Sequence, residues 1–335
     1  MSDPVLTLDA ATRLIEDALI ASNTSAANAA STAAALIRAE ADGQGGHGLS
    51  RVPSYARQAA VGKIDGHATP VLTEVRPGAI RIDAASGFAY PAFDMAFPEL
   101  VTRARANGLA IAAIHRSHHF GVAGHHCETL AEQGMVAFVY GNSPKALAPY
   151  GASVPVLGTN PIAFAAPVPD QAPLVIDMAV TTVARGKILA ARNVGEPIPE
   201  GWALGPDGAP TTDATVALKG SMAPIGGAKG AALALMVEVM SACLAGAAFG
   251  TEASSLFEPE GPPPGLGQTI LAIDPGAVSG GAFAGRMRDL AAIYDALDGA
   301  RLPGSRRLGA RARAAQDGVR VKAALLEQIR GIAGQ

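Results

Sequence analysis

A histidine and an arginine, His47 and Arg51, lie four residues apart. His47 is within a glycine-rich bend at residues 43–48, and Arg51 follows the bend. If the chain is helical from His47 onward, this spacing puts both side chains on one face, one turn apart. A guanidinium can hold a carboxylate by two parallel hydrogen bonds, and a histidine near its unperturbed pKa can protonate a neighbouring carbonyl oxygen. The pair would suit a small 2-oxo acid, although such residues on one helix are more often a solvated face.

The glycine-rich bend, Gly43 to Gly48, has the letters G-x-G-x-x-G of the dinucleotide-binding fingerprint. That fingerprint needs a strand before it and an acidic residue about 20 positions later. Residues 31–42 are instead rich in alanine and predict a helix. We therefore reject the fingerprint and expect a bend that frees the backbone around His47.

Five of the seven histidines fall within residues 115–126: His115, His118, His119, His125 and His126. Because His and Cys are zinc ligands, a metal-binding module without redox activity is one reading of this cluster. No acidic residue lies inside it, and it follows a predicted strand and opens a helix. This context instead predicts a loop that lays backbone amides against a cofactor, with no metal.

Three further segments carry groups that could contact a ligand. Residues 157–161 offer the Thr159 hydroxyl in a turn, and residues 224–230 open a long helix with three glycines and Lys229 but without the Walker spacing. Asp177 ends an apolar strand. Such a residue is more often a helix cap, but a contact with a histidine would raise the pKa of that histidine.

Composition bounds the class of protein. The chain has 335 residues, of which 49% are hydrophobic and 4% aromatic, as expected for closely packed α/β structure. A net charge of −3 does not favour nucleic acid as a partner. Two cysteines form no disulfide framework, and the first residues lack the features of a secretory signal, so we expect a cytoplasmic protein.

The order of apolar segments predicts a mixed sheet. Strands are expected at 109–114, 135–140, 162–166, 173–178 and 268–274, and helices at 91–107, 181–193, 281–298 and from about 321. Two successive strands have no helix between them, which argues against a purely parallel sheet. Residues 231–250 are long and apolar enough to suggest a membrane span, but Glu238 lies in the middle, so we expect a buried core helix and no membrane contact.

Taken together, these motifs resemble the type-2 malate/L-lactate dehydrogenase family. That family includes sulfolactate and ureidoglycolate dehydrogenases, diketogulonate reductase and reductases of piperideine- and pyrroline-2-carboxylate. The resemblance covers essentially the whole chain and rests on motifs that occur in the family's order: His47-Gly48-Leu49-x-Arg51, Ser117-x-His119-Phe120-Gly121, Leu157-Gly158-Thr159-Asn160-Pro161, Asp177-Met178-Ala179 with Gly186-Lys187, Gly226-Gly227-x-Lys229-Gly230 and Leu302-Pro303-Gly304.

The resemblance implies a non-Rossmann α/β fold with a mixed sheet, NAD or NADP as cofactor, and a homodimer. It also implies three parts: a helical segment at 1–75 that carries His47 and Arg51, an NAD(P)-binding domain at 76–300, and a tail at 301–335 that completes the first part. His47 looks like the acid/base, with His119 as second choice, and Arg51 and Thr159 look like substrate contacts. The implied cofactor contacts are His119, Phe120, Gly121, Val122, Ala123, Asp177, Met178, Ala179, Lys229, Gly230, Gly304 and Arg306.

Two positions depart from the family pattern. Most relatives carry Ser directly before the histidine, where its hydroxyl can join a proton relay, but Gly46 stands here. Similar cyclic-imine reductases tend to carry an acidic residue where Lys187 lies, suited to a cationic iminium. Lys187 therefore favours an anionic substrate such as a dicarboxylate or a sulfonate, with the cyclic-imine reductase as the alternative activity.

The expected reaction interconverts an anionic 2-oxo acid and its 2-hydroxy acid by hydride transfer. In this hypothesis His47 protonates the carbonyl oxygen while Arg51 and Lys187 fix the anionic ends. Asp177, if it reaches the imidazole, would keep His47 protonated in the reducing direction.

Overall fold

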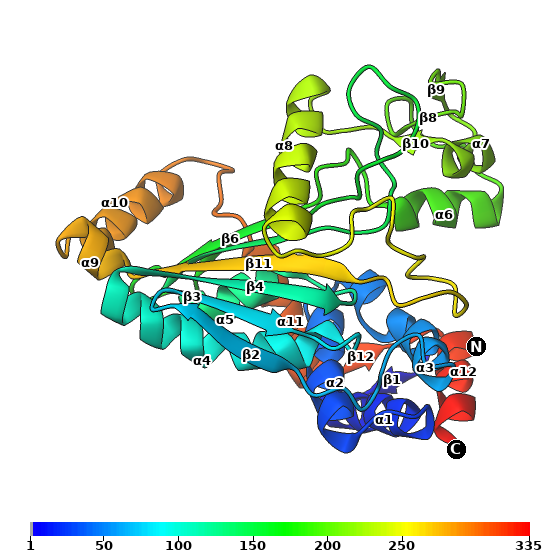
Figure 1. Cartoon of the computed structure of the whole chain (residues 1–335), viewed down its shortest axis with the longest axis horizontal. Helices are drawn as coiled ribbons and strands as arrows, with labels where there is room; N and C mark the ends of the chain where they lie inside the picture. The colour runs from blue at the N-terminus through cyan, green and yellow to red at the C-terminus, as the bar shows by residue number, and fades with distance from the viewer. Residues whose placement is uncertain (1–2) are drawn as a thin grey trace.

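The computed structural model describes residues 3–335, which fold around a seven-stranded sheet of order β2-β3-β4-β11-β5-β6-β7 (Figure 1). Strands β3 and β4 are parallel, and the other neighbours in this sheet are antiparallel. The mixed sheet predicted from the sequence is therefore confirmed. Its strands are β2 (Val71–Arg76), β3 (Ala79–Asp83), β4 (Leu109–Ser117), β5 (Val136–Gly141), β6 (Ile162–Ala166), β7 (Leu174–Met178) and β11 (Leu266–Ile273).

One face of the sheet is covered by α4 (Ala89–Asn107) and α5 (Ala123–Ala131) (Figure 1). Helix α4 ends where the sequence predicts, because Gly108 adopts the left-handed conformation with φ 83° and its amide caps the Ala104 carbonyl. Buried Ala, Ile and Phe side chains from both helices and from the central strands form the main core. This core holds the ends of β4 and β7 in fixed positions.

A second core joins the two ends of the chain. The helices α1 (Leu8–Ala21), α2 (Ala26–Ala41) and α3 (Val52–Ala60) pack with α12 (Ala323–Ala333), and β1 (Val5–Leu6) pairs with β12 (Val319–Arg320). Helix α11 (Ser305–Asp317) lies against α2. The C-terminal segment therefore supports the helices that flank His47 and Arg51.

A smaller unit with its own core stands on the other side of the sheet (Figure 1). It contains α6 (Arg185–Val194), α7 (Ala214–Lys219) and a small sheet of β8 (Ala203–Leu204), β9 (Pro210–Thr211) and β10 (Ser221–Met222). Helix α6 begins four residues later than expected, because Thr181 still forms a β-bridge with Pro224. Helices α9 (Pro275–Ser279) and α10 (Phe283–Asp295) project from the far edge of the large sheet.

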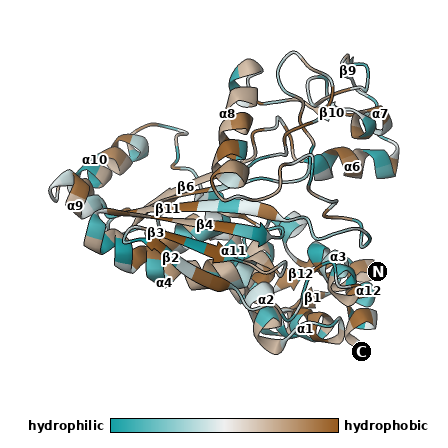
Figure 2. Ribbon diagram, in the orientation of Figure 1, coloured by the Kyte–Doolittle hydropathy of each residue, from teal (hydrophilic) through white to brown (hydrophobic). Residues whose placement is uncertain are grey.

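The long apolar segment is not the buried helix that we expected. Helix α8 (Ala228–Glu238) continues as a π-helical turn, η3 (Val239–Cys243), and one side is exposed: Leu235 by 57%, Val239 by 47% and Leu244 by 52%. Figure 2 shows apolar turns on α8 where it stands clear of the large sheet. Glu238 is buried instead, and its carboxylate accepts hydrogen bonds from Asn160 (2.8 Å) and the Gly250 amide (2.7 Å). Within residues 3–335, no helix is long and apolar enough to cross a membrane.

Candidate active site

His47 and Arg51 lie in two short 3₁₀ turns, η1 (Gly45–His47) and η2 (Leu49–Arg51), and not in one continuous helix, so the condition for a shared helical face is not met. The chain turns sharply between them at Gly48, where it passes the end of α2. A Cβ on Gly48 would collide with the Glu40 carboxylate and lie 3.1 Å from the Glu40 backbone nitrogen. The Glu40 carboxylate also accepts a 2.9 Å hydrogen bond from the Leu49 amide. Glu40 thus shapes this turn, and the sequence pattern did not reveal its role.

The Arg51 guanidinium is held from two sides. Its Nε donates to the Gly46 carbonyl at 2.8 Å, and its Cζ lies 5.2 Å from the centre of the Phe257 ring. Neither contact is an ion pair, and no carboxylate pairs with Arg51 in the described part of the chain. The charge of this arginine is therefore free to meet an anionic ligand.

The two candidate acid/base residues lie together. The rings of His47 and His119 are stacked, with centroids 5.4 Å apart and planes inclined by 11°. His119 Nδ1 lies 2.5 Å from the Tyr55 hydroxyl, which lies 3.2 Å from the Tyr90 hydroxyl. Two tyrosines thus extend the site into the core. No sequence motif indicated either tyrosine, although Tyr55 follows Arg51 by one helical turn.

The pKa of His47 is lower than the near-normal value that we expected. Burial, together with the positive charges of Arg51 and His125, lowers the pKa of His47 to about 4. Burial also lowers the pKa of His119 well below its ordinary value. His47 Nδ1 is buried and has no hydrogen-bond partner among residues 3–335. Both imidazoles are therefore neutral near pH 7 in the free site.

The expected support of His47 by Asp177 is not seen. The Asp177 carboxylate accepts a 2.8 Å hydrogen bond from the Gly124 amide at the start of α5, and no hydrogen bond or ion pair joins it to a histidine in the described chain. A Cβ on Gly124 would lie 3.0 Å from the Asp177 Cβ, so this close approach depends on glycine. Asp177 links β7 to the loop that carries His119.

The segments expected to contact the cofactor lie side by side. Gly124 bonds to Asp177, the Ile225 amide bonds to the Val180 carbonyl at 3.0 Å, and a Cβ on Gly304 would lie 3.2 Å from the Val175 carbonyl oxygen. The glycine turn before α8 is open, with φ 58° at Gly226 and nothing within 4 Å of a Cβ there. Backbone amides, glycines and the end of β7 thus form a surface that fits an extended anionic cofactor.

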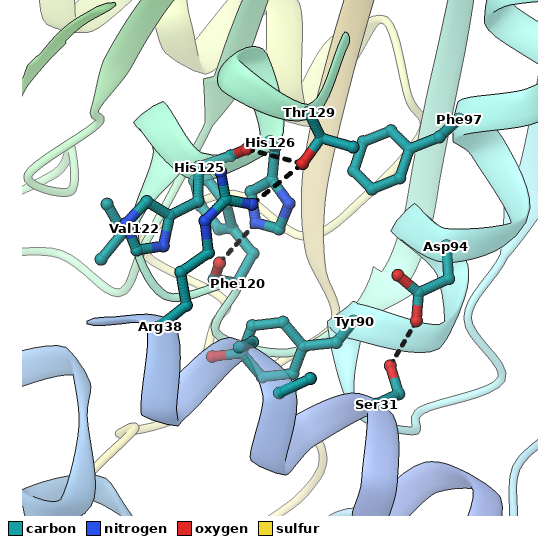
Figure 3. A pocket seen from close by; sticks show the side chains of 12 residues that line it. Ser31, Arg38, Tyr90, Asp94, Phe97, Phe120, Val122, His125, His126 and Thr129 are labelled. Carbon is teal, nitrogen blue, oxygen red and sulfur yellow. Dashed lines mark hydrogen bonds between the residues drawn. The ribbon is translucent and has the colours of Figure 1, made fainter. Parts of the chain in front are cut away.

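The loop of residues 119–122 has two faces. His119 points toward Tyr55, whereas Phe120 and Val122 line a cavity of about 180 Å³ between α2, α4 and α5. Figure 3 shows Arg38 bonded to Thr129 in this cavity, and Ser31 bonded to Asp94. This cavity lies behind the loop, so Phe120 and Val122 anchor the loop to the helices rather than facing His47.

The remaining histidines of the cluster have separate partners. His118 Nε2 lies 3.0 Å from Gln58 Oε1, His125 Nε2 lies 2.9 Å from the Asp42 carboxylate, and His126 Nε2 lies 2.7 Å from the Phe120 carbonyl oxygen. Among residues 3–335, no group of three His, Cys, Asp or Glu side chains is arranged to hold a metal ion. The cluster serves several local functions and does not converge on one point.

Other predicted residues lie at the edges of the site. The hydroxyl of Thr159 lies 3.2 Å from that of Ser143, and the Thr159 carbonyl accepts from the Val180 amide at 3.1 Å, next to the end of β7. Lys187 on α6, Lys229 on α8 and Arg306 on α11 are exposed. None of these three makes a side-chain hydrogen bond or ion pair within the described residues.

The mixed sheet, with five of its six strand pairs antiparallel, is not the parallel sheet of Rossmann enzymes and belongs to the sulfolactate/malate dehydrogenase-like class of folds. The family model for malate/L-lactate dehydrogenase matches residues 6–330. The chain belongs to this family, as the motifs predicted, and is a dehydrogenase-type oxidoreductase.

The relatives agree with this assignment. The chain is 47% identical over 305 residues, 90% of each protein, to a (2R)-3-sulfolactate dehydrogenase (NADP(+)) of Chromohalobacter salexigens. It is 42% identical to a Δ1-pyrroline-2-carboxylate/Δ1-piperideine-2-carboxylate reductase of Pseudomonas putida, over 88% of this chain and 87% of that one.

Solved structures confirm the fold. The Δ1-piperideine-2-carboxylate reductase of Pseudomonas syringae pvar. tomato superposes with a TM-score of 0.93 at 36% identity, covering 98% of this chain and 99% of that chain. The sulfolactate dehydrogenase of Methanocaldococcus jannaschii superposes with a TM-score of 0.90 at 30% identity, covering 99% and 97%. The sulfolactate/malate dehydrogenase-like fold expected from the sequence is therefore confirmed.

Proposed function

We propose that this protein reduces a small anionic 2-oxo acid to its 2-hydroxy acid, and catalyses the reverse oxidation, with NADP or NAD. The observation that carries the proposal is the stacked His47–His119 pair next to the unpaired Arg51. An unpaired guanidinium suits a carboxylate, and a neighbouring imidazole suits proton exchange with the adjacent oxygen. The sulfolactate dehydrogenase relative supports an anionic substrate and NADP.

The cofactor is held, in this proposal, by the loop at residues 119–123, by Asp177 to Ala179, and by Lys229 and Gly230. Gly304 lies beside β7, and Arg306, two residues later, is exposed and free to meet a phosphate. A bound nicotinamide supplies the hydride. The chain itself then has to orient the oxo acid, exclude water and move one proton.

Arg51 and His47 divide this work. Arg51 binds the carboxylate next to the reacting carbon, with the Phe257 ring and the Gly46 carbonyl fixing the guanidinium. His47 exchanges a proton with the oxygen on that carbon. Because the charge of Arg51 contributes to the low pKa of His47, a carboxylate bound to Arg51 offsets that charge and raises this pKa. Substrate binding thereby prepares His47 to donate a proton during reduction.

Tyr55 positions the second imidazole. Its hydroxyl bonds to His119 Nδ1, so Nε2 of His119 is directed away from Tyr55. We propose that His119 orients the reacting groups and that Tyr55 and Tyr90 fix its ring. With Gly46 in place of the family's serine, this tyrosine pair supplies hydroxyl groups that connect to His119.

A substrate panel tests the reaction. Oxidation of NADPH and of NADH is followed with pyruvate, oxaloacetate, sulfopyruvate, 2-oxoglutarate, 2,3-diketogulonate and Δ1-piperideine-2-carboxylate. Turnover of a 2-oxo acid is the expected result, and oxaloacetate or sulfopyruvate should give the highest kcat/KM. If no 2-oxo acid is reduced, the proposal is wrong.

The acid/base assignment needs two variants. His47→Ala should lower kcat by about 10²- to 10⁴-fold with cofactor affinity unchanged, which is the usual effect of losing a general acid. His119→Ala should lower kcat less and disturb cofactor binding, because His119 lies in the cofactor loop. A larger loss of kcat in His119→Ala than in His47→Ala would reverse the assignment.

The second candidate activity is NADPH-dependent reduction of a cyclic imine. The fold superposes closely on a Δ1-piperideine-2-carboxylate reductase, which supports this alternative. Lys187 argues against it, because it stands where similar cyclic-imine reductases tend to carry an acidic residue suited to a cationic iminium. Activity on the imine alone would establish the alternative.

We also propose a homodimer in the cytoplasm, and we keep the three-part division at residues 75 and 300. The exposed apolar side of α8 and η3, with Leu235, Met236, Val239 and Leu244, supports association with a second copy. The shared core of the N-terminal helices and α12 supports the division. Size-exclusion chromatography with light scattering tests the oligomeric state, and a monomer would contradict the proposal.

A further inference from the structure

A second hollow lies next to Arg51, between the small unit and the rest of the molecule. It has a volume of about 540 Å³ and is bounded by one face of α6, one face of α7 and residues 255–258. Phe257 belongs to its wall and also carries the Arg51 guanidinium on its ring, at 5.2 Å. The hollow therefore begins one side chain away from the proposed carboxylate contact.

The wall that contains Phe257 is fixed to the element that follows Arg51. Lys63 Nζ donates to the carbonyl oxygens of Ser255 (2.7 Å), Glu258 (2.8 Å) and Glu260 (3.0 Å). From α3, Gln58 Nε2 donates to the Leu256 carbonyl at 2.9 Å. These bonds fasten the loop on both sides of Phe257. The position of the hollow relative to Arg51 is therefore fixed by these bonds.

The opposite wall is cationic. Arg185, Arg192 and Lys219 all line the hollow, and Glu258 is the acidic residue in its lining. No carboxylate pairs with any of the three cations in the described part of the chain. Three positive groups against one negative group leave an excess of positive charge that favours an anion.

Arg185 is the most buried of these cations. It is half-buried, and its guanidinium makes one long hydrogen bond, 3.4 Å from Nη2 to the Leu218 carbonyl. Arg192 is exposed and bonds to the neighbouring Asn193 side chain at 2.9 Å, and Lys219 is exposed. A half-buried guanidinium with most of its five donors unused is suited to a charge-assisted bond with a ligand.

We infer that this hollow is an anion subsite in which Arg185 receives the distal carboxylate or sulfonate of the substrate. The inference rests on the proposed function, because Arg51 must hold the first carboxylate. It moves the second anion contact from Lys187 to Arg185. Lys187 is exposed on the same helix but does not line the hollow, since two residues along an α-helix point in nearly opposite directions.

Selectivity between dianionic and monoanionic substrates tests the inference. For Arg185→Met, kcat/KM for oxaloacetate and sulfopyruvate should fall by about 10- to 100-fold, as expected when a charge-assisted bond is lost. kcat/KM for pyruvate and KM for NADPH should stay close to those of the unchanged protein. Arg185→Lys, which keeps the charge but not the planar fork, should recover part of the selectivity.

Two further variants serve as comparisons. Arg13→Met removes an equal charge from the exposed face of α1 and should leave selectivity unchanged. Lys187→Met removes a charge from the same helix outside the hollow. If Lys187→Met loses the selectivity while Arg185→Met keeps it, the inference is overturned. It is also overturned if Arg185→Met changes only KM for NADPH, because the hollow would then hold a cofactor phosphate.

A binding measurement separates this inference from the proposed function. Sulfolactate should raise the melting temperature of the unchanged protein and of Arg13→Met, but should do so much less in Arg185→Met. Failure of the whole substrate panel with a normal melting shift would contradict the proposed reaction and leave the subsite standing. Turnover of 2-oxo acids with equal selectivity and equal shifts in all variants would contradict the subsite alone.

Discussion

The last turn of α2 separates two clusters of polar side chains with opposite character. Glu40 lies under the turn that carries His47, in the histidine centre formed by His47, Arg51, Tyr55 and His119. Two residues later, Asp42 enters a charge network that joins α2, α5 and α11. The network consists of Arg38, Asp42, His125, Glu128, Arg307 and Arg311.

Each charged side chain in this network has an oppositely charged partner, and Arg307 Nε is the one buried network atom without a hydrogen bond among residues 3–335. Arg311 bonds to both oxygens of Asp42, at 2.7 and 2.8 Å, and Glu128 bonds to Arg307 at 2.7 Å and to Arg38 at 2.8 Å. Burial alone would raise the pKa of Asp42, but hydrogen bonds from His125 and Arg311 outweigh this and hold the pKa well below its usual range. The carboxylates of Asp42 and Glu128 are therefore ionised at neutral pH, and they hold the C-terminal segment against α2 and α5.

In the histidine centre, by contrast, key polar groups have no charged partner. His47 Nδ1 is buried without a partner, and the Arg51 guanidinium faces an aromatic ring instead of a carboxylate. Buried polar groups in folded proteins are normally paired, so an unpaired set is costly unless a ligand completes it. Paired charges thus hold α2, α5 and α11 together, whereas the groups without charge partners lie where we propose that the substrate binds.

The largest expected effect is the loss of stability when the charge network is changed. Glu128→Gln removes the nearer of the two carboxylates that pair with the buried Arg307, at 2.7 Å, and leaves Asp42 at 3.9 Å, so it should lower the free energy of unfolding by roughly 3 kcal/mol. Urea denaturation measures this change, with the exposed Glu132→Gln on the same helix as a control. A loss no larger than that of the control would mean that the network does not stabilise the fold.

A smaller effect is expected on substrate affinity and on the pKa of His47. Arg51→Met should raise KM for the oxo acid by about 10-fold or more, because a charge-assisted bond is lost. It should also raise the pKa of His47 above its value of about 4, since the Arg51 charge is one cause of that low value. NMR titration of the imidazole measures the shift, and an unchanged pKa would show that the Arg51 charge does not contribute to the low pKa.

The pH dependence of stability should follow the buried histidines. Burial lowers the pKa of His118 and of His126 to about 3 each, whereas the unfolded chain binds these protons near pH 6.5. The unfolded state therefore binds more protons as the pH falls below about 6.5, and the free energy of unfolding should fall by about 1 kcal/mol per pH unit for each histidine. The loss should continue until the pH reaches the folded pKa values.

One variant checks the source of this slope. His126→Phe keeps an aromatic ring against Phe93, whose centroid lies 3.7 Å from that of His126, but removes the titrating group. The pH slope between about pH 6 and about pH 5 should decrease by one proton. An unchanged slope would assign the acid sensitivity to other groups.

The smallest effect is expected at Gly46. A Cβ there meets no atom within 4 Å, and Gly46 is not among the glycines with positive φ, so Gly46→Ser should change stability by no more than about 0.5 kcal/mol. The new hydroxyl lies next to His47 and should change kcat by about threefold or less, the scale of one hydrogen bond. Gly46→Ala is the matched control. A large loss of stability in both variants would show that the turn has no room for a side chain.

Much of the architecture was determined by sequence alone. Residues 162–166 form β6 as predicted, and α4 ends at Gly108, because an apolar run between turns and a left-handed glycine are local signals. The family and the type of reaction followed from motifs that are short and contiguous. His47 and Arg51 were identified in this way, although they lie in two 3₁₀ turns and not on one helix.

Only the tertiary structure decided which of these groups meet. Tyr55 bonds to His119 across 64 residues, and Arg311 bonds to Asp42 across 269 residues. Asp177 bonds to the Gly124 amide instead of a histidine, and Gly48 turns because Glu40 lies beneath it. The pKa of His47 depends on burial and on charges from other segments. Spacing along one chain does not encode such contacts, because they arise only when separate elements pack together.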